Sequence, residues 1–447
     1  MSNSQFKQRI LKGGSWAFAG KIVTALTGLS INALLTRLLS PEDMGTYFLL
    51  LSLTSFFATL AQLGLTSTIL KLVAESIGTN QESKARLAIR LTVRLFGTAL
   101  LITIYLLAYG GGAWLAEHLL HSEVLAQLAG LSAVWMTIMA SQQLIAEIYR
   151  GFHDIKLATL FGGLTTSFLA MLLFLILWFY HQQSDLYEVL FLTLIAGASS
   201  VIISSLILWH KITKLTLPKG DELNISDITS IASPLWITRL MLFVLFQVDI
   251  WMMGIFCSSE QIAAYGAATR LIALVAMPFM IINAVVPPII AEMYAKGKLH
   301  ELEEKLRIIA TLSSIPSILS VIIIGFYSES ILALFFGEFY RSGGNILIIL
   351  GIGQMVNMLF GSCGEVLIFS GHQKLIMQIT IFCGLLTVGM TWWLAQLYQG
   401  IGVSAAMTLG LVFQNILMLV ITKIKTNIWT HAFILKKHHL KAFIGNK

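Results

Sequence analysis

The segment ATLFGGLTTSFLAMLLFLILWFY, residues 158–180, contains no charged side chain. A helix needs about 20 apolar residues to cross the hydrocarbon core of a bilayer, so this segment predicts a membrane span. Similar runs occur along the whole chain. We expect about twelve spans, near residues 13–35, 44–68, 90–115, 124–146, 158–180, 188–209, 229–253, 262–290, 307–327, 344–369, 376–397 and 401–422. The predicted fold class is an all-α polytopic membrane protein, because helices satisfy their own backbone groups in lipid.

The composition supports a membrane protein. Hydrophobic residues make up 57% of the chain and charged residues 11%, whereas soluble proteins carry roughly 25% charged residues. The mean hydropathy is +0.82. A formal charge of +7 would suit nucleic acid or a membrane, but the charges lie between long apolar runs, so we expect no nucleic-acid partner. Cys257, Cys363 and Cys383 match no metal spacing or disulfide framework and are expected to be small apolar fillers.

Lys and Arg residues are distributed unequally between alternate loops. With the N-terminus placed in the cytoplasm, the inner segments hold 23 of the 29 Lys and Arg residues, the outer loops two, and the spans four. The positive-inside rule therefore predicts that both termini are cytoplasmic. The first apolar run is too long for a cleavable signal peptide and is expected to be retained. The basic tail suits either an amphipathic segment on anionic headgroups or a solvated terminus.

The chain shows a weak internal repeat at an offset of 218 residues. Ser40, Glu42 and Tyr47 fall on Ser258, Glu260 and Tyr265, and Glu147, Lys156 and Leu157 fall on Glu365, Lys374 and Leu375; these are the landmarks that fix the offset. We expect two six-helix lobes, residues 1–218 and 219–447, the second with the basic tail. Six spans per half make both halves insert the same way up, as in transporters with parallel repeats and a cavity between the halves.

Two cations occupy equivalent positions inside the expected spans. Lys21 falls on Arg239 in the repeat register, and both are expected at roughly 12–15 Å above the inner surface. A charge at that depth is costly unless it faces protein or water. One interpretation is that both line a substrate cavity; the other is that both extend to the inner interface.

Further ionisable residues lie in or beside the spans. Arg270 and Asp249 flank the turn between spans seven and eight and are expected either to form a structural pair or to place Arg270 against the ligand. Asp249 and Glu365 are candidates for an ion-coupling or structural acid, since burial raises the pKa of a carboxylate. Glu147, the repeat partner of Glu365, is better explained as a helix-end acid in water or in an ion pair.

Uncharged polar residues recur at three and four positions along three expected spans, on one helix face each. The sets are Lys21, Thr24, Gly28 and Asn32; Ser52, Ser55, Thr59, Gln62 and Thr66; and Gln354, Asn357, Gly361 and Glu365. They suit a polar cavity, with Asn32, Gln62, Gln354 and Asn357 as candidate substrate contacts. They also suit helix packing in lipid, where small and polar residues join helices.

No catalytic or metal-binding pattern is found, so we expect a non-enzyme without cofactor or metal. Five of the seven prolines lie in spans of the second half, where they suit either bending gates or static kinks. They are Pro234, Pro278, Pro287, Pro288 and Pro316.

The segment RLLSPEDMGTY at residues 37–47 resembles the first outer turn of the oligosaccharide flippase (polysaccharide transporter, O-antigen flippase-like) family. That family belongs to the multidrug/oligosaccharidyl-lipid/polysaccharide exporter (MOP) superfamily. Gln62-Leu63-Gly64-Leu65 is similar to the family's end of span two, and Asp249 followed by YGAATRL at residues 265–271 to its second-half counterpart. The resemblance covers the whole chain in length and span count, and implies the MATE-like fold with two lobes related by a pseudo-twofold axis.

The resemblance implies flipping of a polyprenyl-pyrophosphate-linked oligosaccharide, such as an O-antigen, lipopolysaccharide or capsule repeat unit, across the cell inner membrane by alternating access. Its cationic cavity would use Lys21, Arg239 and Arg270. The implied partners are this substrate, membrane lipids, and a polysaccharide polymerase and chain-length protein. Alternatives are a multidrug antiporter of the same superfamily and a polysaccharide polymerase or ligase. The enzyme alternative lacks a sizeable outer catalytic segment.

Overall fold

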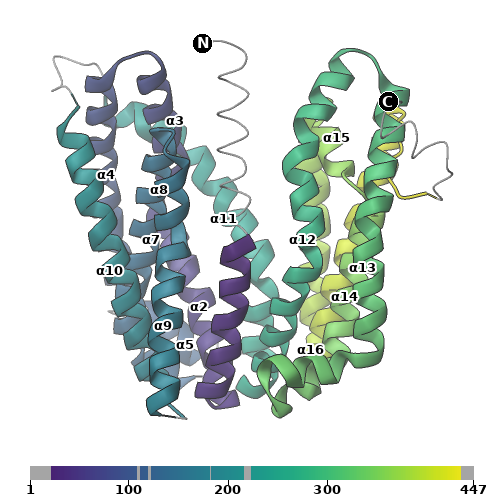
Figure 1. Cartoon of the computed structure of the whole chain (residues 1–447), viewed down its shortest axis with the longest axis horizontal. Helices are drawn as coiled ribbons and strands as arrows, with labels where there is room; N and C mark the ends of the chain where they lie inside the picture. The colour runs from purple at the N-terminus through teal and green to yellow at the C-terminus, as the bar shows by residue number, and fades with distance from the viewer. Residues whose placement is uncertain (1–21, 108–110, 119–121, 182, 216–222, 434–447) are drawn as a thin grey trace. The chain divides into compact units, whose positions relative to one another are not determined.

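The computed structural model describes residues 22–107, 111–118, 122–181, 183–215 and 223–433. Every regular element in these ranges is helical (Figure 1). After the helix Ile22–Leu38 come α2 (Pro41–Gln62), α3 (Leu65–Gly78), α4 (Glu82–Leu106), α5 (Gly112–His118), α6 (Glu123–Gln127), α7 (Ala129–Gly151), α8 (Ile155–Thr159), η2 (Leu160–Leu164), α9 (Thr165–Tyr180), α10 (Leu186–Thr213), α11 (Ile225–Phe256), α12 (Ser259–Ala295), α13 (Leu299–Phe336), η3 (Glu338–Gly343), α14 (Gly344–Phe360), α15 (Cys363–Phe369) and α16 (Gln373–Thr426).

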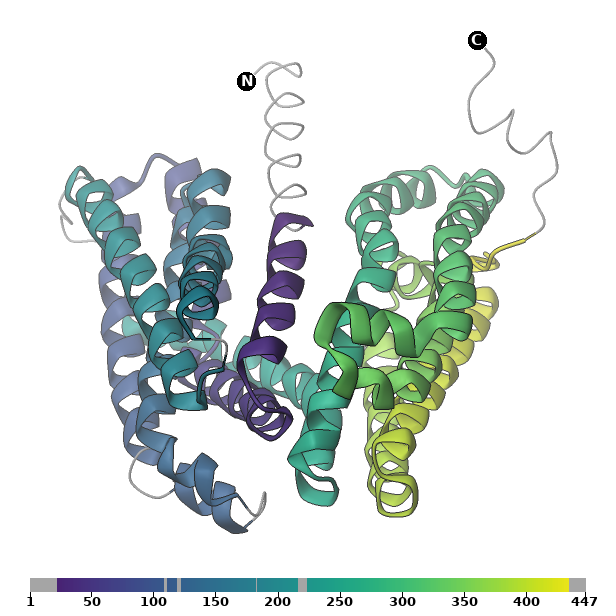
Figure 2. The same cartoon turned by 60° about the horizontal axis from the view of Figure 1, so that its bottom comes forward.

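Most of these helices have the length and composition of membrane spans. Among the described residues, eight helical stretches are long and apolar enough to cross a bilayer, and two shorter apolar helices are Ile22–Leu38 and Phe246–Phe256. One stretch, α16, contains 54 residues but is a hairpin that turns at Gln399, where φ is 51° (Figure 2). Thr387 and Gly410 meet across this hairpin. Its two legs are the predicted spans 376–397 and 401–422.

The chain forms two compact units, Met1–Trp251 and Met252–Lys447. In the first unit α7 packs against α2, α3 and α10, and α10 packs against α9. Tyr149 on α7 is fully buried and donates a hydrogen bond to the Ser204 carbonyl on α10 over 2.8 Å. Gly151 allows α7 to approach α3 closely, since an added Cβ would lie 2.7 Å from the Val73 side chain.

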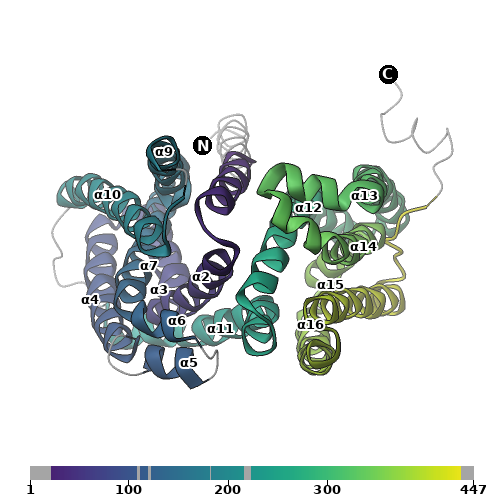
Figure 3. The ribbon, with the colours of Figure 1, turned by 90° about the horizontal axis from the view of Figure 1, so that it is seen from below.

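The second unit is built around α14. This helix packs against α12, α13 and α16, and α15 packs against α12 and α16 (Figure 3). A Cβ on Gly353 of α14 would lie 3.1 Å from Thr408 Oγ1 on α16, a tight contact, and Thr408 Oγ1 donates to the Ile349 carbonyl over 3.0 Å. Small residues thus bring these helices together, as expected where apolar burial alone gives no preference for protein over lipid.

The 218-residue offset relates helix boundaries in the two units. Helices begin at residues 41 and 259 and again at 155 and 373, and helices end at 151 and 369. Ser40 and Ser258 both cap the first of these helices by accepting a backbone N–H three residues later. His153 and Gly371 both have positive φ in the turn that follows the helix end. Because α11 groups with the first unit, the units divide at residue 251, and the repeat boundary at 218/219 stays a prediction.

Among the described residues, three predicted spans contain positive-φ positions and are not single regular helices. Span 158–180 is interrupted at Gly163, where φ is 138°. Span 44–68 is interrupted at Leu63 and Gly64, where φ is 47° and 72°. Span 344–369 is interrupted at Gly361, where φ is 69°. A positive φ cannot continue a right-handed helix. The proline-containing helices differ: α11 continues through Pro234, and the non-helical residue of α13 is Tyr327 rather than Pro316.

Candidate substrate site

Arg239 is the described cation that lies deepest in a predicted span of the first unit. It follows the start of α11 by 14 residues, about 21 Å at 1.5 Å per residue. Its side chain is exposed in the structure, and Nη2 donates to Ser67 Oγ on α3 over 2.7 Å. The exposed guanidinium is therefore held at one end by a neutral hydroxyl, and no ion pair to it is found among the described residues.

Gly64 sets the position of Ser67 against α11. Its φ of +72° begins α3 after the interruption of span two. A Cβ at this position would lie 2.3 Å from the Ala232 carbonyl oxygen and 2.8 Å from the Trp236 nitrogen, both backbone atoms of α11. Only glycine permits this approach. The sequence Gln62-Leu63-Gly64-Leu65 therefore has a physical role in placing α3 beside Arg239.

A second polar group joins α2 to α11. Ser52 Oγ donates to Gln247 Oε1 over 3.0 Å and accepts the Trp251 Nε1 hydrogen over 3.0 Å. The Phe56 ring meets the Trp251 ring edge-on, with centroids 5.3 Å apart. Ser52 belongs to a predicted polar set, whereas Gln247, Trp251 and Ser67 were not selected from the sequence. A search for amide side chains within the spans would have found Gln247. Ser67 gives no comparable signal, because single serines are common in membrane helices.

The other candidates of the first unit have partners close by. Gln62 is 2% exposed and donates to Gln143 Oε1 on α7 over 2.7 Å. Asn32 donates to the Gly28 carbonyl of its own helix over 2.7 Å. Both arrangements suit helix packing, and the substrate roles of the two side chains stay predictions. Lys21 lies outside the described residues.

The second unit separates the polar set that was predicted on one helix. Gln354 and Asn357 lie on α14, partly exposed, with a 3.4 Å hydrogen bond from Asn357 Nδ2 to Gln354 Oε1. Glu365 follows the interruption at Gly361 and lies on α15. The prediction that these residues share one continuous helix face is therefore wrong, because the helix is interrupted at Gly361. Gln354, Asn357 and Glu365 are all partly exposed.

The remaining ionisable candidates lie on α7, α11 and α12. Asp249 Oδ1 accepts the Ile250 backbone N–H over 2.8 Å. Arg270 is exposed and follows the buried stretch 262–268 of α12. The two residues belong to different compact units, and their pairing stays a prediction. Glu147 forms an ion pair with Arg150 on the same helix.

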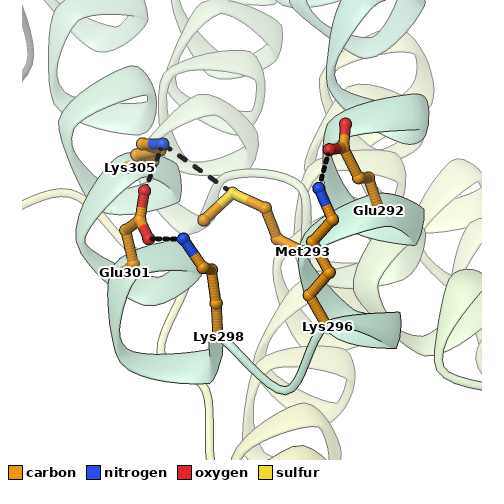
Figure 4. Close-up of polar contacts among 6 residues, drawn as sticks. All are labelled: Glu292, Met293, Lys296, Lys298, Glu301 and Lys305. Atoms are coloured by element: carbon orange, nitrogen blue, oxygen red, sulfur yellow. Dashed lines mark hydrogen bonds and ion pairs between the residues drawn. The ribbon is translucent and has the colours of Figure 1, made fainter.

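The loop between α12 and α13 shows how loop cations are compensated (Figure 4). Lys296 pairs with Glu292. Lys298 and Lys305 both contact Glu301, at 3.3 and 2.7 Å. The hydrogen bond from Lys296 is the largest cause that lowers the pKa of Glu292. The positive charges of Lys296 and Lys298 lower it further. These lysines are thus largely neutralised, unlike Arg239, whose described partner is a hydroxyl.

Several solved transporter structures have a similar fold. The chain is similar to an inward-facing multidrug resistance MATE family transporter of the MOP superfamily, with a TM-score of 0.75 at 16% identity over 90% of this chain and 94% of that one. A lipid II flippase, MurJ, in an inward closed conformation gives 0.68 at 14% identity over 91% and 87%. A MOP superfamily transporter from Pyrococcus furiosus gives 0.63 at 16% identity over 94% and 96%.

The chain therefore has the fold of these MOP superfamily transporters, and its long apolar helices are those of a multi-pass membrane protein. The family described as "Polysaccharide biosynthesis protein" matches residues 10–294, and the family described as "MatE" matches residues 234–393. The chain belongs to the polysaccharide biosynthesis protein family, whose model covers more than half of it. No curated protein matches the sequence significantly.

Proposed function

We propose that this protein moves a polyprenyl-pyrophosphate-linked oligosaccharide from the inner to the outer leaflet of the cell inner membrane by alternating access. The family described as "Polysaccharide biosynthesis protein" supports a glycan substrate, and the similarity to a lipid II flippase supports a lipid-linked one. Both termini would be cytoplasmic. A polymerase and a chain-length protein would act on the product, and the chain itself would perform no covalent chemistry.

The single observation that carries the proposal is that Arg239 is exposed within a predicted span and has one described hydrogen bond, to the Ser67 hydroxyl. A guanidinium presents five N–H donors in a fixed fork that matches phosphate oxygens. Here one donor is used by Ser67, and the side chain is exposed at mid-helix. An arginine at that depth is costly unless it faces water or an anion. A pyrophosphate supplies the anion, and Lys21 and Arg270 are proposed to assist.

The test is a double variant, Lys21→Ala with Arg239→Ala, in a strain that depends on this protein for surface polysaccharide. We expect surface polysaccharide to be lost while the amount of protein in the membrane is unchanged. The matched control is Arg94→Ala on α4, an exposed arginine without a described hydrogen bond, which should leave the polysaccharide normal. Normal polysaccharide from the double variant would refute the assignment of the cations.

A second candidate function is multidrug export. The match of the MatE family to residues 234–393 favours it, as does the fold of the inward-facing multidrug transporter. The two functions are separated by deleting the gene: loss of surface polysaccharide with unchanged drug tolerance supports the flippase, and the reverse result supports the exporter.

A further inference from the structure

A cavity of about 540 Å³ lies within the second unit, at the ends of α13, α14 and α16. Its wall is mainly apolar and includes Leu359, Phe360, Leu419 and Trp429, while Arg307 and His431 supply the polar part. Sites for small organic ligands commonly have about 300–1,000 Å³ and this same combination of apolar walls with few polar groups. The cavity plays no part in the proposed flipping reaction.

One wall of the cavity is the segment that follows α16, residues 427–433. Thr430 Oγ1 donates to the Phe360 carbonyl over 2.8 Å, and the Ala432 N–H donates to the Leu359 carbonyl over 2.7 Å. On the other side, the Phe433 N–H donates to Thr311 Oγ1 over 3.0 Å. The segment is thus bonded to both α13 and α14, which gives the cavity a fixed wall.

Arg307 supplies hydrogen-bond donors to this cavity. Its side chain is 25% exposed, and its Nη1 lies 3.8 Å from the nearest carboxylate oxygen, on Glu303. Nε makes a long 3.4 Å hydrogen bond to the His431 carbonyl, and the guanidinium lies 4.5 Å from the centre of the Phe433 ring. Among the described residues, the terminal nitrogens of Arg307 make no hydrogen bond.

The surrounding charges leave the site positive. Glu303 accepts the Trp429 backbone N–H over 3.1 Å and is shared between Arg307 and Lys423, whose Nζ lies 3.9 Å away. Burial, and then the charge of Arg307, lower the pKa of His431 and so favour the neutral form of this ring. Two cations therefore face one carboxylate. His431 Nδ1 is buried and has no hydrogen-bond partner among the described residues.

We propose that this cavity binds one anionic phospholipid, with its phosphodiester against the Arg307 guanidinium and an acyl chain against Leu359, Phe360 and Leu419. The apolar wall selects a ligand with a hydrocarbon chain, and the excess positive charge selects an anionic headgroup over a zwitterionic one. The expected depth of the cavity in the membrane also suits a lipid headgroup. Arg307 lies at the expected start of the span 307–327, and Trp side chains such as Trp429 favour the headgroup region.

The experiment uses the full-length protein, purified in detergent and freed of lipid. Binding of phosphatidylglycerol and of phosphatidylcholine with the same chains is measured by native mass spectrometry. We expect tighter binding of phosphatidylglycerol, and about tenfold weaker binding in Arg307→Gln, since a charge-assisted hydrogen bond is lost. The control Arg341→Gln, which removes an exposed arginine of η3, should bind as the wild type does.

A second variant tests the apolar part of the site. Ala432→Phe places a ring in the cavity without changing its charge, and we expect it to weaken phosphatidylglycerol binding as well. If Arg307→Gln does not fold, Ala432→Phe alone tests whether the lipid binds in this cavity. Unchanged binding in both variants, or equal binding of the two lipids by the wild type, overturns the proposal. Competition by inorganic phosphate as strong as by the lipid overturns it too, because free phosphate would then be the ligand.

Discussion

Gly64 and Arg239 show how a backbone position and a side chain depend on each other. Arg239 stands out in the sequence as a cation within an apolar run. Its partner Ser67 does not, because the contact exists only after Gly64 has turned the chain and let α3 approach α11. The sequence pattern therefore identifies Arg239 as a candidate, but only the close approach of α3 to α11 shows that Ser67 is its hydrogen-bond partner.

Replacement of Gly64 by Ala should be strongly destabilising. A left-handed conformation costs a non-glycine residue about 1–2 kcal/mol, and the new methyl group would lie 2.3 Å from the Ala232 carbonyl oxygen. We expect a lower thermal unfolding midpoint of the purified protein and less protein in the membrane. Gly97→Ala on α4 is the control, since no atom lies within 4 Å of its added Cβ. Equal midpoints for the two variants would contradict this account.

At the scale of single elements, helix ends agree with the internal repeat better than helix interiors do. Ser40 and Ser258 have the same extended backbone and the same capping role 218 residues apart. Ser258 also forms a reciprocal capping box with Gln261. The residues between such landmarks differ, because an apolar position facing lipid accepts many side chains whereas a cap needs a short side-chain oxygen.

Loss of either cap should weaken its helix by a similar amount. Ser40→Ala and Ser258→Ala are each expected to cost about 1 kcal/mol of unfolding free energy, since an orphan N–H loses its acceptor. The measurement is the thermal midpoint, or the rate of limited proteolysis near each turn. Ser258→Asp preserves an acceptor and should behave as the wild type; a loss as large as that of Ser258→Ala would contradict the capping role.

The segment 427–433 should make stability depend on pH through His431. Burial, and then the charge of Arg307, lower the pKa of His431 below its usual 6.5, while Glu303 acts in the opposite direction. The unfolded chain therefore binds the proton more readily than the folded chain. The resulting stability is present above about pH 6.5 and is lost as the pH falls through the folded-state pKa.

This dependence is measured by comparing the wild type with His431→Asn. We expect the thermal midpoint of the wild type to fall more between pH 7.5 and pH 5.5 than that of the variant. The variant retains the other titrating groups, so it reports the contribution of this one ring. The same fall in both proteins would show that His431 is not the group responsible.

At the scale of the whole molecule, the length and number of the apolar runs predicted the fold class, and the similarity to MOP superfamily transporters confirms it. Family membership agrees with the segment 37–47, which lies inside the matched region 10–294. Orientation in the membrane rests on the unequal distribution of Lys and Arg, and it stays a prediction.

Cysteine labelling tests the orientation. In a background with Cys257, Cys363 and Cys383 replaced, Ser342→Cys should react with a membrane-impermeant maleimide in intact cells. Lys296→Cys should react only after the membrane is permeabilised. Both positions are exposed in the structure, so access differs only through the membrane. The opposite pattern would invert the predicted topology and place both termini outside.

The sequence by itself determined the helical class, the long apolar runs and the family, because each depends on local composition and spacing. The interruptions at Gly64 and Gly361, the contact of Ser67 with Arg239 and the cavity beside Arg307 were decided by the tertiary structure alone. The physical reason is that these features arise where two backbones approach more closely than a side chain allows, or where a distant segment closes a wall. Neither condition can be predicted from one of the two contacting segments alone, because each depends on where the other segment lies.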